Sequence, residues 1–283
     1  MTRLLRLVVV LSSLSWLTTA MHAATPSDPG NPLVAPWAGP HGGVPPFDRV
    51  RTADFGPALE AAMAEQLEAI GRITSDPAPP SFDNTIAALE RSARAMERVQ
   101  TVYGVYTGCM SDDALRAVER DMAPKLAAFA DRVFQDDKLF ARIAAVYEAR
   151  ERSGLTPEQQ RLTWLTFTDF VRAGARLDAA AKRELSAINQ KLAELSTRFA
   201  QNLLADETDQ VVFLDDAADT AGLPADVVAA AAAAAAARGK PGQWAIQNTR
   251  SSVEPFLTYA SRRDLREKVW RMFVDRGDGG GAT

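Results

Sequence analysis

The chain has 283 residues, of which 47% are hydrophobic and 24% are charged, which is typical of a globular protein with a sizeable core. Its 32 Lys and Arg stand against 36 Asp and Glu, and the net charge of −4 with no dense basic cluster excludes a nucleic-acid-binding surface. A single cysteine excludes an intramolecular disulfide, so packing must hold the fold. We expect Cys109 to be a small buried apolar residue rather than a nucleophile, since free cysteines are usually buried.

Residues 1–24 predict a secretory signal peptide. Arg3 and Arg6 form a positive segment, residues 7–17 an apolar one, and residues 18–24 a stretch of mostly small side chains. The apolar segment is shorter than the roughly 20 residues that a membrane-spanning helix needs. We therefore expect cleavage on export, a periplasmic mature protein and no membrane association after cleavage; a buried N-terminal helix is the alternative.

Residues 25–50 are rich in proline and glycine and predict an extended leader. Trp37 and Phe47 are its expected anchors on the following domain. A flexible export linker is the alternative interpretation.

Residues 51–209 predict a helical N-terminal domain, because apolar residues recur at helical spacing between short polar or proline-containing breaks. The second helix is expected to start with a cap at Ser81 or Asp83 and to end or bend at Gly104 and Gly108. Pro157 is expected at the first helical position of the fifth helix. The expected helices before the longest one cover residues 54–74, 81–103, 112–134, 137–152 and 156–174.

The longest predicted helix runs from Asp178 to Glu207 without a proline or glycine. Its apolar residues follow steps of three and four, which places them on one stripe. We expect this stripe to pack in a helical domain, because a long solitary helix gains most of its stability from burying its apolar face. The charged residues, Lys182 among them, are expected in solvent. The stripe comprises Leu185, Ile188, Leu192, Leu195, Phe199 and Leu203.

Residues 210–283 predict a small β unit with further helices. Residues 210–214 and 243–248 are short β-like runs that could pair. Between them, residues 224–238 contain nine consecutive alanines, and alanine has the highest helix propensity. Two more helices are expected at residues 251–260 and 262–274. The fold class is therefore all-α with a minor hairpin or two-stranded sheet near residues 210–248.

A search for catalytic motifs identifies no active site. Of the two histidines, His22 lies in the signal peptide, so His41 would be the only one in the mature chain. The chain has no H-E-x-x-H zinc motif, no nucleophile elbow that could use His41 in a triad, and no phosphate-binding loop. The glycines of residues 277–281 end the chain and precede no helix. We thus predict no catalytic, cofactor-binding or metal-binding residue in this chain.

Five stretches together resemble the N-terminal half of the M3 family of zinc metallopeptidases, most closely the bacterial peptidyl-dipeptidase (Dcp) type, with oligopeptidase A and thimet oligopeptidase as more distant relatives. They are NPLVAPWAGPHGGVPPFDRVRTADFGPAL (31–59), PSFDNTIAALERSARAMERV (80–99), LTPEQQRLTWLTFTDFVRAGARL (155–177), INQKLAELSTRFAQNLLAD (188–206) and RRDLREKVWRMFVDRG (262–277).

The resemblance implies a neurolysin-like helical fold and a hydrolase that cleaves short peptides in a channel between two largely helical halves. In that family a zinc ion, held by H-E-x-x-H and a later Glu, activates water, and the motif Glu is the general base. No position here matches those residues. The resemblance therefore implies a chain truncated before the catalytic zinc domain, with the absent C-terminal catalytic half as its partner.

We therefore expect an N-terminal fragment of an exported zinc metallopeptidase that forms one wall of the substrate channel and is inactive alone. The alternative is a non-catalytic secreted helical binding module derived from that family. Trp270 and Phe273 on the last helix are expected to lack part of their packing partners.

Overall fold

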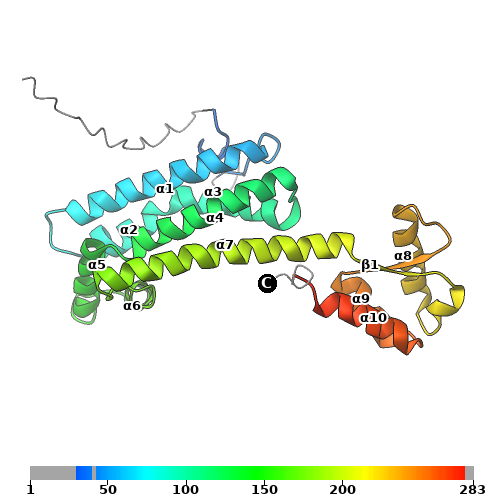
Figure 1. Ribbon diagram of the computed structural model, residues 1–283. Coiled ribbons are helices and arrows are strands. Elements are labelled where there is room, and N and C mark those ends of the chain that lie inside the picture. The colour runs from blue at the N-terminus through cyan, green and yellow to red at the C-terminus, as the bar shows by residue number, and fades with distance from the viewer. Residues whose placement is uncertain (1–29, 40–42, 278–283) are drawn as a thin grey trace, which may run out of the picture.

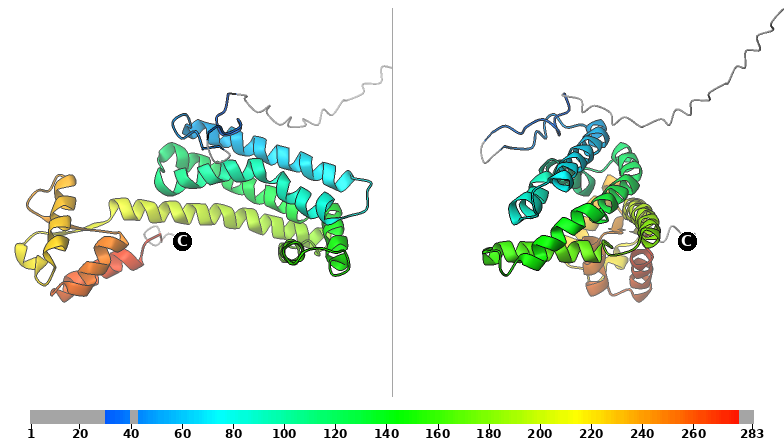
Figure 2. Two further views of the ribbon diagram at one scale, coloured as in Figure 1. Left: turned by 180° about the vertical axis from the view of Figure 1, so that it is seen from behind. Right: turned by 90° about the vertical axis from the view of Figure 1, so that its left-hand side faces the viewer.

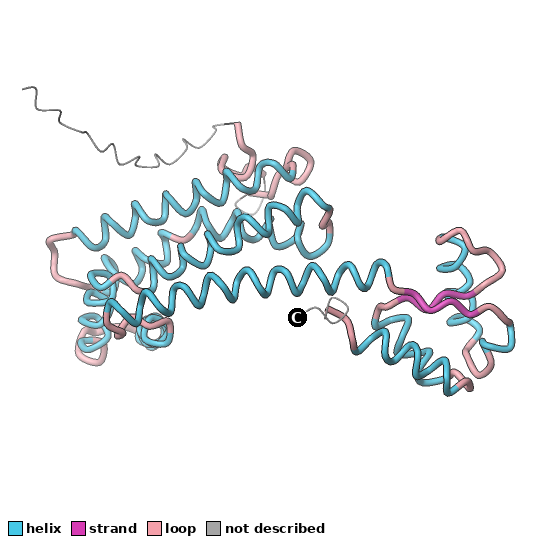
Figure 3. The backbone as a smooth tube through the Cα atoms, viewed as in Figure 1, coloured by secondary structure: helices cyan, strands magenta, loops and turns pink. Residues whose placement is uncertain are grey.

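The computed structural model describes residues 30–39 and 43–277. The predicted signal peptide, His22, His41 and the glycines from Gly279 to Gly281 lie outside these residues. The described part consists of a helical bundle, a long helix α7 (Ala179–Asp209) that runs along it and past its end, and a small unit at the far end of α7 (Figure 1). Figure 3 shows that helices dominate and that the only strands of this part lie in the small unit. The predicted all-α class with a minor sheet is confirmed.

The bundle (residues 52–172) contains six α-helices and one π-helical turn. Several of these elements begin at a side chain that accepts a hydrogen bond from a free backbone N–H of the first turn: Ser81, Asp112, Asp136 and Thr156. Pro157 takes the first helical position after Thr156, as the sequence predicts. The elements are α1 (Thr52–Ser75), η1 (Phe82–Ile86), α2 (Ala87–Ser92), α3 (Arg94–Cys109), α4 (Asp113–Phe134), α5 (Asp137–Ala149) and α6 (Pro157–Arg172).

The predicted second helix differs from the structure at two places. It is broken at Ala93 between α2 and α3, and it passes through Gly104 without ending; it ends at Cys109, one residue after Gly108, close to the expected end. A glycine inside a helix costs about 1 kcal/mol relative to alanine. Here the burial of Val102 and Tyr106 on the same helix outweighs that cost.

Cys109 is exposed, so the expectation of a buried thiol is wrong. It lies in the last turn of α3, one turn beyond Tyr106, which is the last residue of that helix inside the core. The core therefore ends before the helix does.

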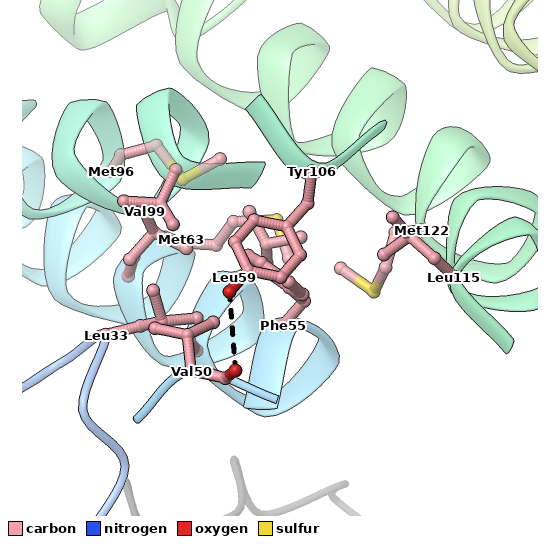
Figure 4. Packing of buried hydrophobic residues seen from close by; sticks show 13 residues of the cluster. Leu33, Val50, Phe55, Leu59, Met63, Met96, Val99, Tyr106, Leu115 and Met122 are labelled. Carbon is pink, nitrogen blue, oxygen red and sulfur yellow. Dashed lines mark hydrogen bonds between the residues drawn. The ribbon is translucent and has the colours of Figure 1, made fainter. Parts of the chain in front are cut away.

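Two adjoining hydrophobic clusters fill the bundle. The first joins α1, α3 and α4 to the leader, where Leu33 is fully buried and the Tyr106 hydroxyl donates to the Val50 carbonyl at 3.4 Å (Figure 4). Trp37 packs against this cluster, and Phe47 stacks on Tyr106. The second lies toward α5 and α6, around Ile86, Leu139, Ile143 and Phe170.

The small unit, called here the hairpin unit, comprises residues 210–277. Strands β1 (Val211–Leu214) and β2 (Trp244–Gln247) pair antiparallel, with Val211 opposite Gln247. The short helix η2 (Ala217–Thr220) and the alanine-rich α8 (Ala225–Ala237) connect the two strands, and α9 (Arg250–Tyr259) and α10 (Arg263–Val274) follow them. A third cluster, centred on Leu214, Ile246 and Phe256, holds the unit together.

Candidate functional site

The most unusual surface of the described chain is the outer face of α7. The helix begins at Ala179 and is capped by Asp178, whose carboxylate accepts from the backbone N–H groups of Ala180 and Ala181 at 2.8 and 2.9 Å. It then continues for 31 residues, of which none is buried. A helix of this length without a buried residue is bound to its neighbours by something other than an apolar core.

Polar and small side chains of α7 make its contact with α4. Asn189 donates through Nδ2 to Oδ1 of Asp131 at 2.7 Å. Gln201 donates through Nε2 to the Arg116 carbonyl at 2.9 Å and accepts from Arg120 Nη1 at 2.7 Å. The half-buried Ser186, Ala193 and Thr197 share this face of the helix. The α4–α7 interface is thus made of polar and small side chains and is hydrogen-bonded.

Lys182 contributes to the same contact. Its ammonium group donates to the Gln135 carbonyl at 3.0 Å and pairs with Asp137 at the start of α5. The expectation that Lys182 points into solvent is therefore wrong, because its side chain bridges α7 to the α4–α5 turn and is only 11% exposed.

The apolar stripe faces away from α4. Ile188, Leu192, Leu195 and Phe199 are 48%, 54%, 46% and 54% exposed, and we call these four residues the α7 stripe. The first and the last are eleven residue steps apart, which is roughly 16 Å along the helix axis. The predicted periodicity is present, and Leu185 and Leu203 at the two ends of the predicted stripe are half-buried. For the four residues between them the prediction of packing within the domain is wrong in the described chain, since the opposite, polar face is the one that meets the bundle.

The C-terminal end of α7 is fastened to the hairpin unit by polar contacts. Arg276 pairs with Glu207, and the backbone N–H of Gly277 donates to Oδ2 of Asp206 at 2.8 Å. The fully buried Asn248 donates through Nδ2 to the Met272 carbonyl at 3.1 Å. These contacts hold the turn after α10 against α7, and Figure 2 shows this turn close to the long helix in both views.

Gly277 places this turn at one end of the α7 stripe. Its φ of +83° lies in the left-handed region that favours glycine, and a Cβ here would lie 2.6 Å from Cε2 of Phe199. The backbone therefore lies directly against the Phe199 ring. A side chain at position 277 would displace either the turn or the ring.

Other large apolar side chains are exposed on α6, on α10 and between α6 and α7. Trp270 is exposed as expected, whereas Phe273 is half-buried against the third cluster, with the Arg276 guanidinium over its ring. Neither side chain is fully buried within the described residues, which agrees with the expectation that Trp270 and Phe273 lack part of their packing partners. The exposed residues on these elements are Trp164, Leu165, Leu177, Trp270 and Val274.

Two of the hollows in the described chain lie within the bundle. One, of about 390 Å³, is lined by apolar residues of α2, α3, α4 and α6, with Glu90, Glu97 and Asp169 on its walls. The other, of about 620 Å³, is wide open and lies near Arg72, Asp76 and Arg91. Both histidines lie outside the described residues, and these residues contain no group of three His, Cys, Asp or Glu side chains able to hold a metal ion.

The clearest pKa shifts belong to groups with structural roles. Burial, with the nearby Glu119 carboxylate as a second cause, raises the pKa of Tyr103 to about 12. The hydrogen bond from Arg262 lowers the pKa of Asp264 to about 2. Neither group lies in a hollow that could hold a substrate.

Comparisons with known proteins identify peptidases. The chain is 33% identical over 235 residues to dipeptidyl carboxypeptidase of Escherichia coli, a match that covers 83% of this chain and 34% of that protein. It is 27% identical over 245 residues to the organellar oligopeptidase A of Arabidopsis thaliana, covering 83% of this chain and 30% of the relative. It is 23% identical over 246 residues to oligopeptidase A of Escherichia coli, covering 87% and 35%.

No protein-family model matches the chain. The chain spans about a third of the length of the curated relatives it matches. Within the described residues, no helix is both long and apolar enough to cross a membrane.

Proposed function

We propose that this chain, a homologue of the N-terminal portion of the M3-family peptidases over most of its length, acts as one part of a peptidase that hydrolyses short peptides. The observation that carries the proposal is the 33% identity over 235 residues to a dipeptidyl carboxypeptidase. By analogy with that relative's name, the reaction would be removal of dipeptides from the C-terminal end of a peptide.

The reacting groups of this peptidase would lie outside the present sequence. The relatives are zinc enzymes by the family resemblance, and a zinc ion would supply an activated water and polarise the scissile carbonyl. The described residues offer no ligand set that fits such an ion. We therefore assign this chain no catalytic step and expect it to be inactive by itself.

The contribution of this chain would be architectural. Its bundle and the hairpin unit, joined by α7, would form one wall of the channel that admits peptides and excludes folded proteins. The first and second hydrophobic clusters of the bundle both include residues of α1, and their close packing would keep such a wall rigid.

Export is part of the same proposal. Residues 1–24 have the charge and apolar pattern of a cleaved signal peptide, which would place the peptidase in the periplasm. Mass spectrometry of the mature chain, isolated from an expressing bacterium, should then show an N-terminus near residue 24. Retention of Met1 would contradict it.

The central test uses two proteins. One is this chain alone, and the other is a hybrid in which this chain, through Gly277, replaces the matched third of Escherichia coli dipeptidyl carboxypeptidase. Release of dipeptides from a short peptide is measured with and without a metal chelator. The hybrid should cleave the peptide in a chelator-sensitive way and the chain alone should not. Cleavage by the chain alone, or a folded hybrid without activity, would contradict the proposal.

A further inference from the structure

We infer that the α7 stripe is the surface on which the remaining part of the peptidase packs, and that it is a permanent interface rather than a wall of the substrate channel. This inference rests on the proposed function, since it takes the partner to be the portion of the relatives that follows the matched third. The stripe is Ile188, Leu192, Leu195 and Phe199, about half exposed in each case.

The chemistry of the stripe favours a permanent interface. Three aliphatic side chains and one aromatic ring stand in line without a polar residue among them. Permanent interfaces resemble a domain core cut in half, whereas a surface that binds and releases varied peptides needs polar groups that can stay hydrated. An exposed row of apolar side chains on a monomeric protein also indicates a surface that contacts another molecule.

The charges beside the stripe exclude two other classes of partner. Lys191 and Glu194 pair at 3.1 Å on its flank, and the exposed Glu184 and Arg198 add one charge of each sign beside it. A membrane or a nucleic acid would call for an excess of positive charge along this face. The flanks are balanced instead, as at the rim of a protein interface.

The position of Gly277 indicates which protein segment covers the stripe. The turn at Gly277 lies against Phe199, so polypeptide joined after this turn would start beside one end of the stripe. A segment tethered there has a high effective concentration, in the millimolar range for a short link, at the surface it must bind. A second copy of this chain has no such advantage.

The size of the stripe predicts when it is covered. Four half-exposed side chains expose a patch of roughly a few hundred Å², below the roughly 1,000 Å² that a specific interface between separate proteins needs. The stripe should therefore be covered when the rest of the peptidase is on the same polypeptide and remain largely free in the isolated chain.

Thiol labelling tests this directly. In a Cys109→Ser background, which removes the exposed native thiol, Leu192→Cys and Leu195→Cys report on the stripe. Ala187→Cys is the matched control, because Ala187 is exposed, adjoins Ile188 in sequence and points about 100° away around the helix. Each variant is made in the isolated chain and in the hybrid with the Escherichia coli enzyme, and the rate of reaction with a water-soluble maleimide is measured.

In the isolated chain all three thiols should react rapidly. In the hybrid, labelling at positions 192 and 195 should slow by at least about tenfold, since the thiols would become accessible only through local opening. Labelling at position 187 should not change. Equal labelling at position 192 in a hybrid that cleaves peptides would overturn the docking surface and leave the proposed function standing.

The opposite pattern is also informative. Protection of position 192 in a folded hybrid without peptidase activity would support the docking surface and count against the proposed function. Protection that already appears in the isolated chain and increases with its concentration would assign the stripe to a second copy and overturn the inference. If the first hybrid does not fold, the same labelling rates are measured in a second hybrid, built with the remainder of Escherichia coli oligopeptidase A.

Discussion

Helices α1 and α7 carry similar apolar periodicity and use it differently. Of the 24 residues of α1, eight are buried, among them Phe55, Leu59 and Ile70. Of the 31 residues of α7, none is buried, and its most apolar face is its most exposed one. An amphipathic pattern therefore shows that a helix has a partner, but not that the partner lies in the same stretch of sequence.

The two helices also differ in what holds them. Helix α1 is surrounded by α3, α4 and the leader through apolar contacts. Helix α7 meets α4 through hydrogen bonds such as Asn189 to Asp131 and Gln201 to Arg116. Such bonds contribute about 0.5–1.5 kcal/mol each, less than a buried leucine. The position of α7 along the bundle is thus specified by polar contacts, and its apolar face is left for another contact.

The largest expected effect compares the same substitution in both helices. Leu59→Ala removes a fully buried side chain and should lower the free energy of unfolding by about 2–5 kcal/mol. Leu192→Ala removes a side chain that is 54% exposed and should change it by less than about 0.5 kcal/mol. Urea unfolding, followed by circular dichroism, measures both. Equal losses of unfolding free energy in the two variants would show that the stripe is covered in the isolated chain. The difference drawn here between α1 and α7 would then be wrong.

A smaller effect is expected at the polar face of α7. Asn189→Ala deletes one donor to Oδ1 of Asp131, which is 8% exposed. The variant should lose about 0.5–1.5 kcal/mol of unfolding free energy, since the same oxygen keeps the hydrogen bond from Gln135 Nε2 at 3.2 Å. Ser196→Ala, on an exposed position of the same helix, is the control and should stay within about 0.5 kcal/mol. An unchanged midpoint in Asn189→Ala would mean that the α4–α7 contact does not depend on this bond.

The smallest effect is a pH dependence of the free energy of unfolding, and it comes from one tyrosine of the bundle. Tyr103 contacts Phe55 of α1, and its pKa is raised from 10.0 to about 12 in the folded protein. Its contribution to stability is fully present below pH 10 and is lost between about pH 10 and 12, because the unfolded chain ionises first. Tyr103→Phe should flatten the stability curve in that window. Identical curves for the two proteins would show that Tyr103 does not titrate as described.

Local signals in the sequence predicted most of the fold. The cap at Ser81, the proline at 157 and the helical period located most helix starts, and the short β-like runs at residues 210–214 and 243–248 located the sheet. These features act within a few residues and are therefore visible in a single sequence. The π-helical turn at Phe82–Ile86 was missed, since its geometry depends on tertiary packing of Thr85 and Ile86.

The candidate site was less predictable for a physical reason. The periodicity of Ile188, Leu192, Leu195 and Phe199 was plain, but the sequence could not show that α4 would pair with the other face. That choice depends on Asn189 and Gln201 finding partners 58 and 85 residues away in the chain. Cys109 was misplaced for a related reason, because the edge of the core beyond Tyr106 is a tertiary property.

Helix α8 has a consequence of a different kind. Nine of its residues, Ala229 to Ala237, are identical, and Ala231 and Ala235 are the ones that the unit buries, in a helix packed on β2. Inserting or deleting one alanine would turn one end of the helix by about 100° relative to the other, yet the residue brought to the sheet would again be alanine. The repeat can therefore change length by a residue without changing the surface it presents, and gene variants that differ in the number of these codons should encode hairpin units with the same packing.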